Sequence, residues 1–213
     1  MRRSLFGIIF LLVIAGLIWF RASWVATYKN FPPQAGRTWL ALGDSLTAGY
    51  GAGASEDYPS VLGELLGVEI KNLGVNGQTS GEGLERIHDA LALEPGVALL
   101  CLGGNDGLRQ LPPHEMFANL AAIIDRLHDA GAFVVLIGIR SANLVDKNEK
   151  RFRQLAKQKQ VLYVPNILRG VLGEPDLMDD MVHPNARGYR VIAERLAREL
   201  RPCVKKLVPA LAK

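Results

Sequence analysis

The sequence predicts an α/β protein, an open three-layer α/β/α sandwich built on a five-stranded parallel sheet. Short apolar runs alternate with longer amphipathic segments, which is typical of βαβ units with right-handed crossovers. The longest apolar runs lack polar alternation, as expected for strands buried on both faces. Glycine-rich polar segments follow several of these runs, where strands would end in loops.

The elements alternate along the chain from Thr38 onward. The apolar runs predict strands over Thr38–Leu42, Val68–Leu73, Val97–Leu102, Phe133–Ile139 and Val161–Val164. The amphipathic segments predict helices over Tyr58–Leu66, Gly81–Ala92, His114–Ala130, Asn148–Lys159 and Pro184 to about Leu200. Residues 38–204 are long and apolar enough to form one domain around one core.

Four polar loops follow predicted strands. They are "GDSL" at 43–46, "GVNGQTSG" at 74–81, "GGNDGLRQ" at 103–110 and, after the last strand, "DDMVHPNARGY" at 179–189. Because the carboxyl ends of parallel strands lie at one edge of the sheet, these loops should converge there. Open α/β sheets bind their ligands at that edge.

Ser45 is a candidate nucleophile, because a serine on such a loop attacks a carbonyl once a base takes its proton. His183 is the candidate base. Asp180, three residues earlier, can accept the Nδ1–H of His183 across a tight turn and leave Nε2 free for the Ser45 proton. Pro184 suits the first position of the last helix, which would place His183 at the helix entry.

Gly77 and Asn105 are candidate donors for an oxyanion. Gly77 can bring its N–H close to a substrate, and Asn105 carries a side-chain NH₂ on the loop after the central strand. With the Ser45 N–H they would supply three donors for one developing negative charge. No cluster of His, Cys and carboxylates has the spacing of metal ligands, so we expect neither a metal nor another cofactor.

These four blocks resemble those of the SGNH hydrolase, or GDSL esterase/lipase, superfamily. Gly43-Asp44-Ser45-Leu46, Gly77, Gly104-Asn105-Asp106 and Asp180-x-x-His183 occur in the order of that family and span Leu40 to Leu200. Within it, "LALGDSLTAGYGAG", "NLGVNGQTSGEGLERI" and "LGGNDGLRQLPP" look most like the bacterial periplasmic arylesterase, acyl-CoA thioesterase and lysophospholipase group.

The resemblance implies a flavodoxin-like SGNH hydrolase fold and a serine esterase that cleaves acyl esters or thioesters through an acyl-enzyme on Ser45. It implies His183 as the base and selects Asp180 over Asp179 as the orienting carboxylate. It also implies an oxyanion hole of Ser45, Gly77 and Asn105. Two further acids of the blocks are expected to shape loops as hydrogen-bond acceptors, namely Asp44 and Asp106.

Two other functions stay open. A carbohydrate O-acetyl esterase acting on cell-envelope glycans is the alternative, since related members remove O-acetyl groups, and an inactive anchored binding domain is the third hypothesis. The segment "IRSANLVDKNEKRF" matches the family group only at its start, so acyl-chain preference and the role of Ser141–Arg151 are left open. The oligomeric state is not predicted.

Residues 1–28 are expected to form an N-terminal membrane anchor or signal segment. An uninterrupted apolar run, Leu5–Phe20, follows two arginines, and bulky or charged residues near its end disfavour signal cleavage. The positive-inside rule leaves Met1 in the cytoplasm, so we expect an inner-membrane protein whose catalytic domain faces the periplasm. A processed signal, giving a soluble periplasmic or secreted protein, and a buried soluble helix are the alternatives.

Charge and composition complete the domain organisation. Four of the 25 Lys and Arg residues lie in the first thirty positions, which hold no Asp or Glu, so the remaining 21 basic residues equal the 21 acidic ones. A basic footprint for nucleic acid is therefore absent. Residues 29–37 are expected to be a linker and residues 205–213 a C-terminal tail. Cys101 and Cys203 lack redox or metal spacing and are expected to be reduced thiols.

Overall fold

The computed structural model describes residues 28–33, 38–139 and 147–211, and within them five strands form one parallel sheet. The strands lie in the spatial order β2-β1-β3-β4-β5, and every neighbouring pair is parallel. This confirms the predicted five-stranded parallel sheet. Their bounds are β1 Thr38–Gly43, β2 Ile70–Gly74, β3 Pro95–Cys101, β4 Phe133–Ile137 and β5 Leu162–Val164.

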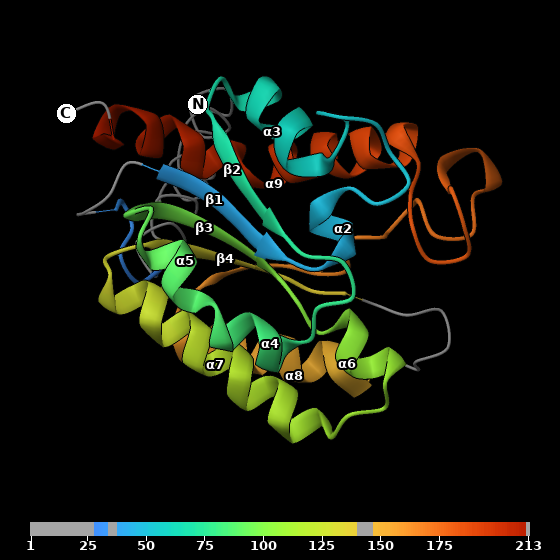
Figure 1. The fold of residues 1–213 in the computed structure, drawn as a ribbon. Helices are drawn as coiled ribbons and strands as arrows, with labels where there is room; N and C mark the ends of the chain where they lie inside the picture. The colour runs from blue at the N-terminus through green and yellow to red at the C-terminus, as the bar shows by residue number, and fades with distance from the viewer. Residues whose placement is uncertain (1–27, 34–37, 140–146, 212–213) are drawn as a thin grey trace, which may run out of the picture.

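Helices cover both faces of the sheet and complete the three layers (Figure 1). One face carries α3 (Tyr58–Leu66) and α9 (Ala186–Leu211). The other carries α4 (Ser80–Glu85), α5 (Ile87–Leu91), α7 (Pro113–Asp129) and α8 (Lys147–Lys159). Each face therefore has its own buried apolar core.

The strands serve both cores at once. In β1, Trp39 and Ala41 belong to the core under α3 and α9, whereas Leu40 and Leu42 belong to the core under α7 and α8. Successive side chains of a strand point to opposite faces, so a strand buried on both faces must be apolar at every position. This explains the unbroken apolar runs of the sequence.

Some boundaries differ from those predicted. Strand β2 begins at Ile70 rather than Val68, because the Val68 N–H closes the end of α3 by donating to the Gly63 carbonyl at 3.0 Å. The helix predicted over Gly81–Ala92 is two helices, α4 and α5, which meet at Arg86 with φ −100°. Two short helices, α2 (Ser45–Ala48) and α6 (Gly104–Leu108), and the 3₁₀ turn η1 (Pro175–Leu177) were not predicted.

Helix α9 starts later than predicted. Pro184 lies before the helix, bridged to Met178, and Asn185 caps the first turn by accepting the Gly188 N–H at 3.1 Å. The expectation that Pro184 occupies the first helical position is therefore wrong. At its other end α9 continues to Leu211, so residues expected as a tail are helical.

The segment at 28–33 lies against the folded domain at the amino end of β4. Asn30 Nδ2 donates to the carbonyl oxygens of His128 (2.8 Å) and Ala132 (3.1 Å), and the Phe31 ring packs edge-on to Phe133 at 5.0 Å. Of the expected linker, residues 29–33 thus make specific contacts. The expected anchor, apart from residue 28, lies outside the described residues.

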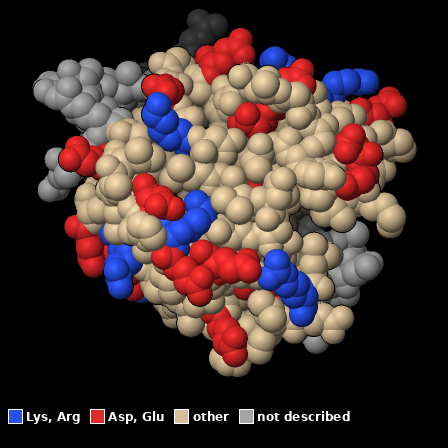
Figure 2. Space-filling view, in the orientation of Figure 1, with Lys and Arg blue, Asp and Glu red and all other residues tan. Residues whose placement is uncertain are grey.

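Among the residues that the structure describes, no helix has the length and apolarity needed to cross a membrane. Figure 2 shows acidic and basic side chains interspersed over the face of the domain in view. Several acidic and basic side chains of the described residues are paired locally, as in Lys159 with Asp125 and Arg153 with Glu149. Cys101 and Cys203 are both buried.

Candidate active site

The four polar loops meet at the carboxyl edge of the sheet. The strand order reverses between β1 and β3, and in open α/β sheets this reversal opens the crevice that binds ligands. Ser45 follows β1 directly, and Asn105 follows β3. The loop at 178–183 reaches the same edge from the other end of the chain.

Glycines let helix α2, which begins with Ser45, fold back on the ends of the strands. A Cβ on Gly43 would lie 2.0 Å from Thr47 Oγ1, and one on Gly74 would lie 2.1 Å from the Ala48 backbone nitrogen. Only glycine permits such close packing. Asp44 then caps α2 by accepting the Leu46 N–H at 3.0 Å, which fixes the turn that presents Ser45.

The structure brings Ser45, His183 and Asp180 into hydrogen-bond contact. His183 Nε2 lies 2.9 Å from Ser45 Oγ, and His183 Nδ1 lies 2.8 Å from Asp180 Oδ2. A carboxylate only accepts hydrogen bonds, so Nδ1 carries the proton and Nε2 offers its lone pair to the serine. This is the arrangement that activates a serine nucleophile.

The loop itself fixes the Asp180 carboxylate. Its Oδ1 accepts the backbone N–H groups of Val182 and His183, both at 2.7 Å. The hydrogen bond from the His183 ring, followed by these backbone donors, lowers the pKa of Asp180 to about 2. Asp180 therefore stays ionised at neutral pH. Asp179, by contrast, contributes its backbone N–H to the His183 carbonyl.

Tyr50 is a neighbour of His183 that the sequence patterns did not identify. The two rings lie 4.5 Å apart at 47°. The backbone carbonyl of Tyr50 accepts a 2.8 Å hydrogen bond from the buried Tyr189 hydroxyl of α9. Helix α9, which follows His183, thus also holds the backbone of Tyr50, whose ring lies beside His183.

The candidate oxyanion donors line the same cleft as Ser45 and His183. Gly77 has φ +74°, in a turn closed by the Gln78 N–H and the Val75 carbonyl at 3.2 Å. The N–H groups of Ser45 and Gly77 make no hydrogen bond to another described residue. Asn105 Nδ2 donates to the Gln78 carbonyl at 3.0 Å and lies 3.4 Å from Asp44 Oδ2. Its second hydrogen is therefore only weakly engaged.

Asp44 and Asp106 act as acceptors within the loops, as expected. Asp106 is buried and accepts from the Ser80 N–H (2.8 Å) and the Ser80 hydroxyl (2.5 Å), which joins α6 to α4. Burial raises the pKa of Asp44 to about 7, against the lowering effect of the Leu46 N–H and of His183. The buried Asp44 carboxyl thus holds the turn that presents Ser45.

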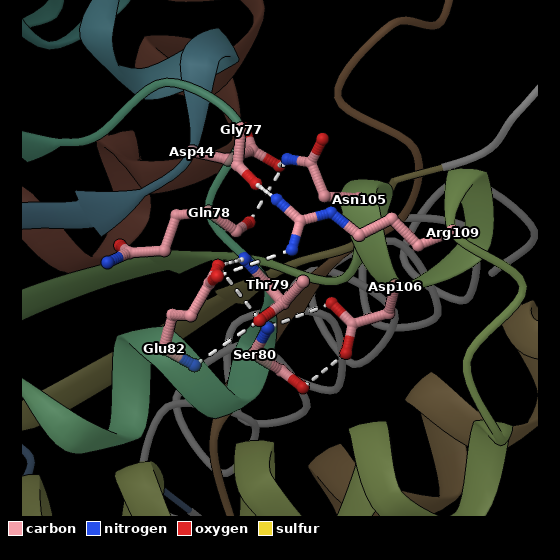
Figure 3. A network of polar contacts seen from close by, with 9 residues as sticks. All are labelled: Asp44, Gly77, Gln78, Thr79, Ser80, Glu82, Asn105, Asp106 and Arg109. Atoms are coloured by element: carbon pink, nitrogen blue, oxygen red, sulfur yellow. Dashed lines mark hydrogen bonds and ion pairs between the residues drawn. The ribbon is translucent and has the colours of Figure 1, made fainter.

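Two charged residues complete the polar network around the Gly77 turn (Figure 3). Arg109 donates to the Gly77 carbonyl at 2.7 Å and to Glu82 Oε1 at 3.2 Å. Arg109 and Glu82 were not predicted as site residues. Arg109 stands four residues after Asn105, one helical turn away, and that spacing was the available signal.

Apolar side chains form most of the cleft beside Ser45. The cleft has a volume of about 420 Å³. Its apolar lining comprises Leu46, Tyr50, Leu108, Ile139, Leu168, Leu172, Met181 and Val182. The segment 140–146, part of the loop whose role the sequence left open, lies outside the described residues. In the described part of the chain, no group of three or more His, Cys, Asp or Glu could hold a metal ion.

Comparison with known proteins matches the model of the GDSL-like lipase/acylhydrolase family to residues 41–191. The chain is 36% identical to an arylesterase of Vibrio mimicus, over 78% of this chain and 90% of the relative. It is 35% identical to thioesterase 1/protease 1/lysophospholipase L1 of Escherichia coli K12, over 82% of this chain and 88% of the relative. The solved structure of esterase EstA from Pseudoalteromonas sp., inhibited by monoethylphosphonate, superposes with a TM-score of 0.70 at 29% identity, over 81% of this chain and 99% of that one.

Proposed function

The chain belongs to the GDSL-like lipase/acylhydrolase family and is a serine esterase, and we propose that Ser45, His183 and Asp180 are its catalytic triad. The 2.9 Å contact between Ser45 Oγ and His183 Nε2 carries this proposal. The 2.8 Å contact of His183 Nδ1 with Asp180 supports it, because it leaves Nε2 as the basic nitrogen.

The reaction then proceeds in two halves. His183 Nε2 takes the Ser45 proton while Oγ attacks the ester or thioester carbonyl, and the N–H groups of Ser45 and Gly77 and the Asn105 amide stabilise the oxyanion. Collapse of the tetrahedral intermediate releases the alcohol or thiol, protonated by His183, and leaves an acyl group on Ser45. Water, deprotonated by His183, cleaves this acyl-enzyme and restores the serine.

Replacement of the triad members tests the assignment. Ser45→Ala and His183→Ala should each lower kcat on a soluble p-nitrophenyl ester by at least about 10³-fold and leave the melting temperature within a few degrees. Arg187→Ala, an exposed residue shortly after the triad loop, is the matched control and should keep wild-type kcat. Near wild-type kcat of Ser45→Ala would contradict the triad assignment.

We propose that the substrates carry an apolar acyl chain bound in the cleft. The apolar lining supports this, as do relatives named arylesterase and thioesterase/lysophospholipase. In a series of p-nitrophenyl esters, kcat/KM should rise from acetate to longer chains, because each buried methylene contributes about 0.8 kcal/mol. Best activity on acetate and on O-acetylated glycans would instead indicate a carbohydrate O-acetyl esterase.

A variant of the cleft separates acyl binding from general activity. Met181, 93% exposed at the cleft, should contact the far part of a long chain. Met181→Ser should lower kcat/KM for long-chain esters and leave acetate hydrolysis unchanged. Leu65→Ser, an exposed apolar residue on α3 outside the cleft, is the control and should change neither. Equal losses for all esters would contradict acyl binding at Met181.

We further propose that the N-terminal apolar run anchors the protein in the inner membrane with its domain facing the periplasm. The run Leu5–Phe20 and the arginines before it support this placement. The full chain should then stay with membranes in high salt, since apolar attachment is not screened. A soluble protein with a new N-terminus after about residue 22 would instead indicate signal processing.

A further inference from the structure

The turn that carries the Gly77 N–H is not held by burial. Val75 and Asn76 are exposed, and Gly77 is only partly covered. The hydrogen bond from Gln78 to Val75 and the positive φ of Gly77 are those of a type II turn. A type I turn of the same residues would rotate the peptide between Asn76 and Gly77 and point its N–H elsewhere. Besides its own hydrogen bond and that of the Val75 N–H to the Gly43 carbonyl, the turn is held by side chains that bind the Gly77 and Gln78 carbonyls, which follow this peptide.

Helix α6 provides those contacts from both of its ends. Asn105, in its first turn, donates to the Gln78 carbonyl at 3.0 Å, and Arg109, at its C-cap, donates to the Gly77 carbonyl at 2.7 Å. The backbone N–H of Arg109 also donates to the Asn105 carbonyl at 2.9 Å, so the backbone positions that carry the two side chains are fixed relative to one another. Figure 3 shows both reaching the same turn from α6.

Glu82 fixes the other side of the Arg109 guanidinium. Glu82 Oε1 accepts from Arg109 Nη1 at 3.2 Å, while Oε2 accepts the Thr79 N–H at 2.7 Å in the capping box of α4. The planar guanidinium thus bridges two acceptors in two directions, the turn and the first turn of α4. A lysine ammonium lacks this rigid fork.

We propose that Arg109 is a positioning residue for ester hydrolysis, which holds the Gly77 turn in the shape that aims its N–H at the oxyanion, with Glu82 fixing Arg109. This inference rests on the proposed role of Gly77 and Asn105 as oxyanion donors. The side chains of Arg109 and Glu82 are 50% and 46% exposed, and such ion pairs contribute little to global stability. Loss of Arg109 should therefore affect the transition state more than the fold.

Kinetics of Arg109→Met and Arg109→Lys test the proposal on a soluble ester. Arg109→Met should lower kcat by about 10- to 100-fold with KM within about twofold of wild type, because a misaimed donor weakens only transition-state stabilisation. Arg109→Lys should keep a higher kcat than Arg109→Met, because the lysine ammonium can still donate to one of the two acceptors, the Gly77 carbonyl or Glu82. The rate of fluorophosphonate labelling of Arg109→Met should fall by a similar factor, because the phosphoryl oxygen of the reagent accepts from the same oxyanion donors.

Arg153→Met is the matched control. Arg153 is also an exposed arginine in an ion pair, with Glu149 at 2.7 Å, but it lies on α8 away from the cleft. This variant should keep wild-type kcat, and its melting temperature should equal that of Arg109→Met.

Two results would overturn the proposal. One is a kcat of Arg109→Met within about twofold of wild type, and the other is a loss of activity that follows a lower melting temperature. Ser45→Ala and Asn105→Ala, measured in parallel, distinguish this failure from failure of the proposed function. If both lose activity while Arg109→Met does not, the triad and the Asn105 donor stand and the role of Arg109 falls.

Discussion

The two oxygens of Asp180 have separate tasks. Oδ2 accepts the His183 Nδ1–H, and Oδ1 accepts two backbone N–H groups of its own loop. The carboxylate is thus held by the backbone that carries the histidine, and this arrangement favours a single tautomer of His183. Asp179, its neighbour, takes part through its backbone, and the structure gives its side chain no contact with the imidazole.

Asp180→Asn and Asp179→Asn should therefore differ in rate. The asparagine at 180 can present a donor where His183 needs an acceptor, and the corresponding change in a serine protease triad lowers kcat by about 10⁴-fold. We expect a loss of up to that size for Asp180→Asn and only a few-fold change for Asp179→Asn. The measurement is kcat of both variants on one soluble ester. A larger loss of kcat for Asp179→Asn would mean that Asp179, and not Asp180, orients His183.

Asp44 predicts a pH dependence of stability. Burial raises the pKa of Asp44 from 3.8 to about 7, so between these values the folded protein holds a proton that the unfolded chain has lost. Its contribution to the free energy of unfolding is full below pH 4 and is lost as the pH rises through 7. Asp44→Asn can still cap α2 but does not titrate.

Urea unfolding of wild type and Asp44→Asn from pH 4 to 8 measures this effect. The stability of the variant relative to wild type should increase as the pH rises from 4 to 7. A difference that is independent of pH would show that Asp44 has the same pKa in both states.

At the level of elements, the placement of α2 depends on glycines rather than on helix propensity. A Cβ at Gly74 would lie 2.1 Å from the Ala48 nitrogen and 2.6 Å from the Thr47 carbonyl carbon, both backbone atoms of α2. These are backbone atoms, so α2 or strand β2 must shift to relieve the clash, and a shift of α2 moves Ser45 with it.

Gly74→Ala should destabilise the protein by about 1–3 kcal/mol and also lower kcat, because overpacking here displaces α2 and with it Ser45, the proposed nucleophile. Gly81→Ala is the control. Gly81 lies in α4, where the nearest atom to a new Cβ is Asn119 Nδ2 at 3.4 Å, and alanine favours a helix by about 0.5–1 kcal/mol. Chemical denaturation and kcat of both variants test this, and an unaffected Gly74→Ala would refute close packing of α2.

The same elements show what the sequence could and could not predict. Strands such as β3 were found because burial on both faces makes them apolar throughout. Ser45, Asp180 and His183 were predicted from residue types, spacing and the family resemblance, and the structure brings them into contact. Helices α2 and α6 are too short for a periodic pattern, and Arg109 and Tyr50 became visible only through contacts between distant loops.

For the whole molecule, the N-terminal contacts and the active site lie at opposite edges of the sheet. Asn30 and Phe31 contact the amino end of β4, whereas Ser45 follows the carboxyl end of β1 (Figure 1). If residues 1–28 are a membrane anchor, as proposed, the segment after it stabilises the domain without reaching the cleft.

Deletion of residues 1–33 should lower the melting temperature relative to deletion of residues 1–27. It removes the Phe31 packing and the Asn30 donor of the His128 and Ala132 carbonyls. The His128 carbonyl still accepts the Gly131 N–H at 2.9 Å, so the expected cost of about 1–3 kcal/mol is that of the Ala132 carbonyl if it stays buried. At a temperature where both proteins are folded, kcat should be equal. Equal melting temperatures would mean that the segment is only a linker.

The central claim is that Ser45 attacks the substrate with His183 as its base. Its most direct test is labelling of the full chain with a fluorophosphonate, followed by mass spectrometry of its peptides. We predict one phosphonyl group, on Ser45, with labelling abolished in Ser45→Ala and strongly slowed in His183→Ala, because the 2.9 Å contact is needed to deprotonate Oγ. A label on another residue, or undiminished labelling of Ser45→Ala, would contradict the claim.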